Sequence, residues 1–341
     1  MMVPRAKQVV LMNHTNMLGH HFGCARVMRL IEDGLTERGC AIAGRLDGKL
    51  DWQRDADALK LLGSCDAIVI NGEGTLHHGR KKATWLMEVA SHPITRDKEL
   101  SLINALYQDN PDSWAPLLRG FTHLYARDGR SAAQMSAHAG RPVEYFGDLS
   151  TSAGALPEPD DRSGILVSDS VRNTAAARLA GLASDLARDS EVRLIPLTVS
   201  LREENPYKPL ASRLLRRWTV AARQKLLQRR HPLLRYVASE ETFLDELRRS
   251  CLCVTGRFHG VCLNLVTGTP FITVSSNSWK IEALFEDAGI DRRRLVTPDA
   301  LSRDLVLGQD WAFTATERAN IAAFLDRSQR GAAAMFDAIA A

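Results

Sequence analysis

The sequence predicts an α/β protein in which two similar halves each hold a mostly parallel sheet covered by helices. Three observations support this fold class. The chain has 341 residues, a length that favours two domains over one. Short apolar runs alternate with segments of helical periodicity, as expected for parallel strands joined by helices. A stretch rich in proline, acidic and small residues, 151–163, interrupts this alternation, which then begins again.

The first half begins with a short apolar strand, a polar loop containing glycines at 13–23 and a helix that ends near Gly39. Further strands are expected at 41–46, 66–71, 100–107, 122–126 and 143–146, with helices at 84–90, 113–119 and 131–139. We therefore expect a Rossmann-like domain over residues 1–155.

The second half, residues 156–341, repeats the pattern. Strands are expected at 165–168, 192–199, 233–238, 251–254 and 271–274, and helices at 175–188 and 240–249, after Arg257 and from Thr314 onward. Thr314 and Glu317 have the spacing of a capping box, and this last helix is able to pack back across the first half. Two such halves joined by one linker predict a ligand site in the cleft between them.

The composition excludes several classes of protein. Apolar residues make up 45% and charged residues 25%, and the net charge of +4 gives no sign of a nucleic-acid binder. The six cysteines form no CxxC pair, so reduced, mostly buried thiols and no metal centre are expected. No run resembles a signal peptide or a membrane span, which predicts a soluble cytoplasmic protein. The oligomeric state leaves no signal in the sequence.

Four cations lie at the carboxyl ends of predicted strands: Arg127, Arg172, Arg257 and Lys280. The carboxyl ends of parallel strands share one edge of a sheet, where helix N-termini also favour anions. Guanidinium groups suit both carboxylate and phosphate, so this pattern predicts a site for a small polyanion. His259 lies two residues after Arg257 at the predicted start of a helix. The alternative is that this arginine pairs with a surface carboxylate and the histidine bonds to backbone.

A turn of sequence Asn-Gly-Glu-Gly-Thr, residues 71–75, leaves another strand. The glycines are expected either to let the backbone approach a ligand or to supply positive φ angles in a tight turn. A turn alone has no need of the Glu73 carboxylate. His77 and His78 follow, and without a third ligand at helical spacing they are expected to contact an anion or sugar rather than a metal. For Asp128 and Asp148 the favoured interpretation is helix capping.

The segment 212–239 is strongly basic, and none of its 28 residues is acidic. Leucines and Trp218 could form the apolar stripe of an amphipathic helix over 212–235. Such a helix suits an anionic lipid surface, and the alternative is a solvated helix packed through its leucines.

Taken together, these motifs resemble the polysaccharide pyruvyl transferase family. The resemblance rests on the glycine loop after the first strand, the turn at 71–74, Ala-Arg-Asp at 126–128, Arg-Phe-His-Gly at 257–260, Gly-Thr-Pro at 268–270 and Lys280. It covers roughly residues 8 to 290, and the Arg-Phe-His-Gly segment is its most specific part. The sequence departs from the family where Gly19 is followed by two histidines instead of aspartate, and where Glu73 replaces a glycine.

The resemblance implies two Rossmann-like domains in the manner of GT-B glycosyltransferases. It also implies that phosphoenolpyruvate donates pyruvate to two hydroxyls of one sugar as a ketal, with no cofactor. We expect His259, Arg257 and Glu73 to be catalytic. The expected donor contacts are Arg127, Arg257, His259, Lys280, Gly256 and Arg172. The expected acceptor contacts are Asn16, His20, His21, Asn71, Gly72, Gly74, Thr75 and His77.

The acceptor is expected to be a saccharide of the cell envelope, free or lipid-linked. Two alternatives share the fold: a GT-B glycosyltransferase that uses a nucleotide sugar, and a carbohydrate-binding protein without catalytic activity. Stabilisation by a nucleotide sugar and not by phosphoenolpyruvate would favour the glycosyltransferase. Absence of phosphate release would favour the carbohydrate-binding protein.

Overall fold

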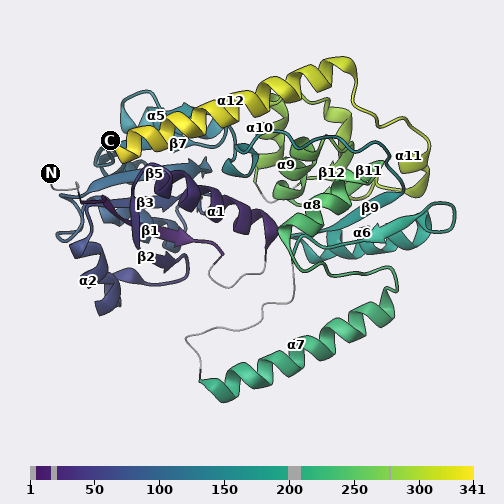
Figure 1. Cartoon of the computed structure of the whole chain (residues 1–341), viewed down its shortest axis with the longest axis horizontal. Coiled ribbons are helices and arrows are strands. Elements are labelled where there is room, and N and C mark those ends of the chain that lie inside the picture. Colours follow the sequence, from purple (N-terminus) through teal and green to yellow (C-terminus); the bar gives the residue numbers. More distant parts are fainter. Residues whose placement is uncertain (1–4, 17–20, 199–208, 276–277) are drawn as a thin grey trace. The chain divides into compact units, whose positions relative to one another are not determined.

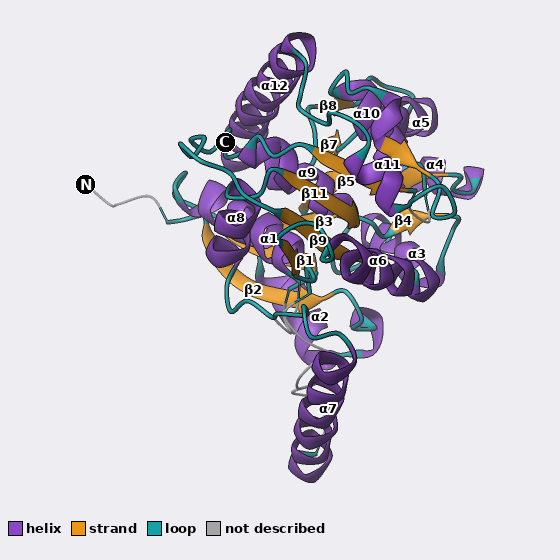
Figure 2. Cartoon of the chain, turned by 90° about the vertical axis from the view of Figure 1, so that its right-hand side faces the viewer, coloured by secondary structure: helices purple, strands orange, loops and turns teal. Residues whose placement is uncertain are grey.

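A computed structural model describes residues 5–16, 21–198, 209–275 and 278–341. The chain divides into two compact units, and each unit is made of more than one segment of the sequence. Unit 1 comprises Met1–Met17, Val27–Ala153 and Asp326–Ala341, and unit 2 comprises Leu18–Arg26 and Gly154–Leu325. Figure 1 shows the elements along the chain, and Figure 2 shows the strands flanked by helices.

Unit 1 is built on a parallel sheet of six strands. Their order is β2 (Ala41–Asp47), β1 (Gln8–His14), β3 (Ala67–Asn71), β5 (Glu99–Ala105), β7 (His123–Ala126) and β8 (Glu144–Tyr145). Its helices are α1 (Phe22–Thr36, from Val27 onward), α2 (Ala56–Ser64), α3 (Lys81–Met87), α4 (Ala115–Arg119), α5 (Gly129–Ala139) and the end of α12 (Ala315–Ala340). A small separate sheet pairs β4 (Leu76–His77) with β6 (Tyr107–Gln108).

Strand β1 shows why both faces of this sheet are covered. Val9 and Leu11 lie in an apolar cluster with α1 and the end of α12, whereas Val10 and Met12 lie in the cluster that includes α2, α3 and α5. Since successive side chains of a strand point to opposite faces, an unbroken apolar run requires helices on both sides.

Unit 2 is built on a second parallel sheet, in the order β10 (Val192–Leu194), β9 (Ile165–Ser170), β11 (Leu252–Gly256), β12 (Phe271–Val274) and β13 (Leu295–Val296). Its helices are α6 (Asn173–Leu186), α7 (Leu210–Arg230), α8 (Glu240–Arg248), α9 (Phe258–Thr267), α10 (Lys280–Asp287), α11 (Arg303–Leu307) and the start of α12. In β11, Leu252 and Val254 face α6 and α11, and Cys253 faces α8, α9 and α10.

The expected fold class, α/β with two Rossmann-like parts, is confirmed, and several expected elements are corrected. Residues 233–238 form no strand: Leu234 makes only an isolated bridge to Leu194. The strand expected at 100–107 divides into β5 and β6 at Leu106. Strand β10 ends at Leu194, and Val199 lies outside the described residues. Cys251 precedes β11 and is exposed, so it does not share a strand face with Cys253.

The capping predictions are confirmed. The Asp128 carboxylate accepts from the backbone N–H of Ser131 at the start of α5, and Asp148 accepts from that of Ser150. Thr314 Oγ1 accepts from Glu317 N–H, and the Glu317 carboxylate accepts from Thr314 N–H, which is the reciprocal pair of a capping box. In the part of the chain that the structure describes, every helix is too short or too polar to cross a bilayer.

Candidate active site

The Arg-Phe-His-Gly segment joins β11 to α9 in unit 2, and two glycines explain its sharp geometry. A Cβ on Gly256 would lie 2.5 Å from Ser170 Cβ on β9 and 3.1 Å from Val274 Cγ2 on β12. A Cβ on Gly260 would lie 2.5 Å from Thr255 Oγ1. The first glycine therefore lets three strands meet at their ends, and the second lets α9 pack closely on β11.

Arg257 lies between these glycines with an extended backbone and a fixed side chain. Its Nε and Nη2 donate to Asp169 Oδ2 at 3.0 and 2.5 Å, and both side chains are 18% exposed. Asp169 is held in turn, because its Oδ1 accepts from the Leu197 N–H at 2.9 Å. The guanidinium is thus oriented at the sheet edge while part of it stays accessible.

Three of the four predicted cations lie at this same edge. Arg172 precedes α6 after β9, Arg257 precedes α9 after β11, and Lys280 begins α10 after β12. Strands β9, β11 and β12 are neighbours in the sheet, so these helix starts are adjacent. Arg172 is exposed and Lys280 half-buried. The arrangement places positive charge and helix N-termini together, which suits an anion.

His259, the second residue of α9, is 7% exposed. Its ring lies edge-on to the ring of His21, with centroids 5.3 Å apart. His21 was predicted on the acceptor side of the first half, yet the segment Leu18–Arg26 belongs to unit 2. A predicted acceptor contact and the predicted catalytic histidine therefore lie side by side.

Four contacts hold the start of α1 in unit 2. His21 bridges Thr198, and the Phe22 N–H donates to the Leu197 carbonyl at 3.2 Å. The Phe22 ring stacks on Phe243 of α8, with centroids 5.5 Å apart. The nearly buried Arg26 side chain pairs with Glu240 at 2.7 Å. Sequence reasoning missed this docking because a polar loop carries no signal of the surface it will meet.

The carboxyl edge of the unit 1 sheet carries a different chemistry, a network of amides. Asn13 Nδ2 donates to the Asn71 carbonyl at 2.6 Å and to Thr75 Oγ1 at 2.9 Å. Asn104 Nδ2 donates to Asn71 Oδ1 at 3.3 Å. Asn13, Asn71 and Asn104 come from three adjacent strands, β1, β3 and β5. Asn13 and Asn104 have φ of 56° and 53°, a region that asparagine tolerates better than most residues. Neither of these two was predicted.

Glu73 is buried in this network at 6% exposure. Its Oε2 accepts from Thr15 Oγ1 at 2.6 Å and from Asn71 Nδ2 at 3.1 Å. Positive φ at the glycines was one of the two alternatives for this turn, but the positive φ falls on Glu73 itself, at 23°. Gly72 is needed because a Cβ there would lie 2.6 Å from Ala105 Cα, so the close approach is to β5.

Arg127, predicted as a donor contact, lies inside unit 1 at 3% exposure. Its Nη1 is 3.5 Å from Asp148 Oδ2, and its Nε is 3.9 Å from Asp128 Oδ2. Burial raises the pKa of Asp128, although the charge of Arg127 and hydrogen bonds from Ser131 oppose this. The Arg127 charge is therefore balanced within unit 1.

The remaining predicted acceptor contacts are dispersed. His77 is buried in β4, Asn16 is half-buried beyond β1, and Gly74 is exposed with no atom near the position of an added Cβ. His20 lies outside the described residues. His77 and His78 pack edge-on at 5.1 Å, with His78 3.7 Å from Asp109. Among described residues, potential metal ligands instead converge at His21, Cys24 and His259, within 4.8 Å of one another.

Comparison with solved structures places the fold. The structure of UDP-GlcNAc 2-epimerase from Methanocaldococcus jannaschii matches with a TM-score of 0.51 at 11% identity, covering 95% of this chain and 98% of that one. The MnaA–UDP structure from S. aureus matches with a TM-score of 0.50 at 11% identity, over 95% and 90%. CalG4, the calicheamicin glycosyltransferase, matches with a TM-score of 0.50 at 12% identity, over 98% and 97%. At these identities the likeness shows a GT-B-like fold alone.

Comparison by sequence adds the family. A search of curated proteins found no match. The family described as polysaccharide pyruvyl transferase matches residues 106–278, slightly more than half of the chain, and this span includes Arg127, Arg172 and the whole Arg-Phe-His-Gly segment. The chain therefore belongs to the polysaccharide pyruvyl transferase family, a family of transferases.

Proposed function

We propose that this protein transfers pyruvate from phosphoenolpyruvate to two hydroxyls of one saccharide, forming a ketal and releasing phosphate. The observation that carries the proposal is the edge of the unit 2 sheet, where Asp169 orients Arg257 and His259 is the second residue of α9. This segment lies within the region that matches the family.

The donor carries a carboxylate and a phosphate ester on the same carbon atom, so at least two cations must converge on it. Arg257 and Lys280 are the proposed contacts, with Arg172 at the rim and the N–H groups at the start of α9 supporting the anion. Gly256 keeps the backbone close to this position. Arg127 is the weaker candidate, because its charge is already balanced by Asp148 and Asp128.

His259 is the proposed proton donor. Protonation of the methylene carbon makes it a methyl group and leaves an oxocarbenium-like centre at the neighbouring carbon. A sugar hydroxyl attacks that centre and gives up its proton. The bond to phosphate then breaks, phosphate leaves with its electron pair, and a second hydroxyl closes the ketal while losing its own proton. The two hydroxyl protons balance the one added to carbon and the one carried away by phosphate.

Glu73 is proposed to accept a hydroxyl proton or to stabilise the cationic centre. The hydrogen bonds from Thr15 and Asn71 fix the position of its carboxylate. The proposed acceptor contacts of unit 1 include Asn16, Asn71 and Thr75. The reaction as written needs no metal or redox cofactor.

The direct test is mass spectrometry of candidate envelope glycans after incubation with phosphoenolpyruvate, together with measurement of released phosphate. The expected result is the mass gained by ketal formation and equal amounts of phosphate. His259→Ala should abolish both, and His231→Ala, which changes a half-buried histidine after α7, should not. Stabilisation by a nucleotide sugar, with no response to phosphoenolpyruvate, would instead support a glycosyltransferase.

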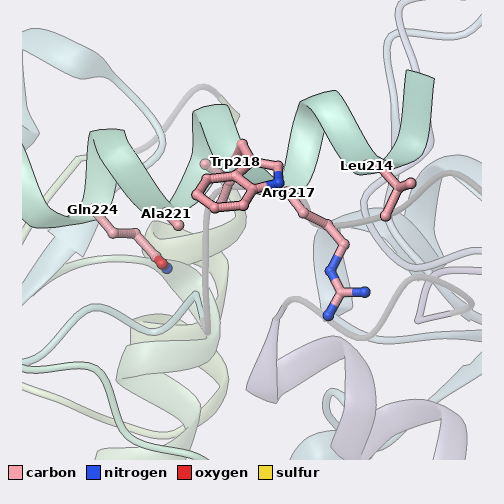
Figure 3. A pocket seen from close by; sticks show the side chains of 6 residues that line it. Leu214, Arg217, Trp218, Ala221 and Gln224 are labelled. Atoms are coloured by element: carbon pink, nitrogen blue, oxygen red, sulfur yellow. The ribbon is translucent and has the colours of Figure 1, made fainter. Parts of the chain in front are cut away.

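We also propose that α7 brings the protein to an anionic membrane surface, where a lipid-linked acceptor would be found. The helix contains seven arginine and lysine residues and no acidic residue. Four of its apolar residues, Leu210, Leu214, Trp218 and Leu226, are 66%, 46%, 78% and 55% exposed, so these side chains are not packed into the protein. Figure 3 shows Leu214 and Trp218 with Arg217 along one side of the helix. These residues line an open hollow of about 510 Å³.

Co-sedimentation with vesicles tests this role of α7. Binding is expected to vesicles rich in phosphatidylglycerol, to weaken with salt, and to be absent with pure phosphatidylcholine. Changing both Leu214 and Trp218 to serine should weaken binding by about tenfold or more, since each buried apolar side chain contributes about 1.5–3 kcal/mol. Leu307→Ser, at an apolar residue of α11 that is 40% exposed, is the control. Equal binding by both variants would contradict the proposal.

A further inference from the structure

Three side chains with metal-binding chemistry meet where the starts of two helices come together in unit 2. His21 directly precedes α1, Cys24 is the third residue of α1, and His259 is the second residue of α9. One ligand atom of each lies within 4.8 Å of the others. His21 and Cys24 are half-buried and His259 is buried, so the cluster is neither sealed in the core nor fully solvated.

The convergence is built into the fold and does not depend on chance surface contact. A Cβ on Gly23 would lie 2.3 Å from His259 Cβ and Cγ, so only glycine between His21 and Cys24 lets the imidazole approach α1 this closely. Phe22 anchors the same turn through its N–H bond to Leu197 and its stacking on Phe243.

The donor set matches a borderline-soft divalent ion. Two imidazoles and one thiolate are ligands that zinc prefers, and three protein ligands leave a position open for water or another oxygen. The first turn of a helix stabilises a thiolate, which is the form of Cys24 that binds metal. His21 Nδ1 accepts a hydrogen bond of 3.2 Å from the Cys24 N–H, and an ion bound at this nitrogen would replace that bond.

The required movement is small. Zinc–sulfur bonds of about 2.3 Å and zinc–nitrogen bonds of about 2.0–2.1 Å bring ligand atoms to within roughly 3.5 Å of one another. The side chains would therefore close by about an ångström, which is within the range of χ rotations. Positive charge nearby opposes a cation, but Arg257 is already paired with Asp169, and the thiolate supplies a negative charge.

We propose that His21, Cys24 and His259 bind one thiophilic divalent ion of the zinc class, with at least one coordination position open. This departs from the expectation, drawn from the spacing of residues in the sequence, that the protein has no metal site. One consequence rests on the proposed function, in which His259 donates the proton. An ion bound to His259 occupies the nitrogen lone pair that would carry this proton, so zinc inhibits pyruvyl transfer.

Cobalt titration tests the site without reference to activity. The full chain is stripped with a chelator and titrated with Co²⁺, with the near-ultraviolet absorption of a cobalt–thiolate bond as the readout. We expect one equivalent to bind, one equivalent of Zn²⁺ to displace it, and the thiolate absorption to vanish in Cys24→Ser. His21→Ala should weaken cobalt binding at least tenfold.

Cys251→Ser is the matched control, because Cys251 is the exposed cysteine of the same unit and should leave the titration unchanged. Absence of uptake by the wild-type chain, or the same thiolate absorption in Cys24→Ser, would overturn the proposal. Circular dichroism of each variant excludes loss of fold as the reason for lost binding.

Activity then separates the site from the proposed function. The ratio of rates with and without zinc is compared within each variant, and we expect strong inhibition of the wild type that a chelator reverses and that Cys24→Ser lacks. Cobalt binding without any pyruvyl transfer would leave the site standing and contradict the function. Pyruvyl transfer without cobalt binding would support the function and contradict the metal site.

Discussion

Arg257 donates through both Nε and Nη2 to one carboxylate oxygen of Asp169, from the end of β11 to the neighbouring strand β9. The pair is partly solvated, and its second carboxylate oxygen is anchored by the Leu197 N–H. Asp169 therefore orients the guanidinium without burying it. In the proposed reaction this makes Asp169 a positioning residue for the donor contact.

Asp169→Asn should lower kcat/KM for phosphoenolpyruvate by about tenfold to a hundredfold, because a misdirected guanidinium loses part of its contact with the donor. Most of the change should appear in KM for phosphoenolpyruvate, with little change in KM for the acceptor. Steady-state kinetics with each substrate varied in turn measures the difference. Asp189→Asn, which removes the exposed partner of Arg303, is the control and should behave as wild type.

Gly256→Ala should destabilise unit 2 by about 1–3 kcal/mol, because the added methyl meets Ser170 on one side and Val274 on the other. The matched control is Gly181→Ala in the middle of α6, where no atom lies within 4 Å of the new Cβ. Gly181→Ala should stabilise unit 2 by about 0.5–1 kcal/mol, since alanine favours the helix. Urea unfolding of both variants gives the comparison, and equal shifts would contradict the packing argument.

Arg127→Met should lower the free energy of unfolding by about 3–5 kcal/mol, because it leaves Asp148, which is fully buried, without its cation. The double variant with Asp148→Asn should recover part of this loss, as the unpaired charge is then gone. A donor contact at Arg127 would show differently: the double variant would be stable but still have a raised KM for phosphoenolpyruvate. Kinetics and unfolding of the wild type, Arg127→Met and the double variant distinguish a structural role of Arg127 from a donor contact.

Arg294 and Glu317 form a buried ion pair in unit 2, with Nε–Oε1 at 2.8 Å. Burial alone would raise the pKa of Glu317, but hydrogen bonds from Arg294 and from the Thr314 N–H outweigh it and lower this pKa from 4.5 to about 2. Because the folded-state pKa is the lower one, the stabilisation is complete above about pH 4.5 and is lost as the pH falls toward 2.

Glu317→Gln should therefore destabilise by about 3–5 kcal/mol at pH 7, and the difference from wild type should shrink below pH 4.5. Glu286→Gln, which alters a solvent-exposed pair with Arg292, should change stability by less than about 1 kcal/mol. Unfolding curves between pH 3 and pH 7 test this. A difference that stays constant over that range would show that the charge of Glu317 is not what stabilises the fold.

The periodic elements and the strand ends were predictable from the order of the residues. Apolar runs such as those of β1, β3 and β12 have one stable arrangement, a sheet covered on both faces, so the fold class follows from local pattern. The capping roles of Asp128 and Thr314 were equally predictable, because the partner lies three residues away. The position of Arg257 at a strand end followed from the same reasoning.

Which side chains meet depends on the folded chain. Arg127 and Arg257 occupy similar places in sequence pattern, yet one is buried between two acids and the other is oriented at a partly solvated edge. His21 joins His259 because the start of α1 docks on unit 2. The physical reason is that these contacts link residues far apart in the chain, and their energies depend on packing and burial, which no local pattern of residues specifies.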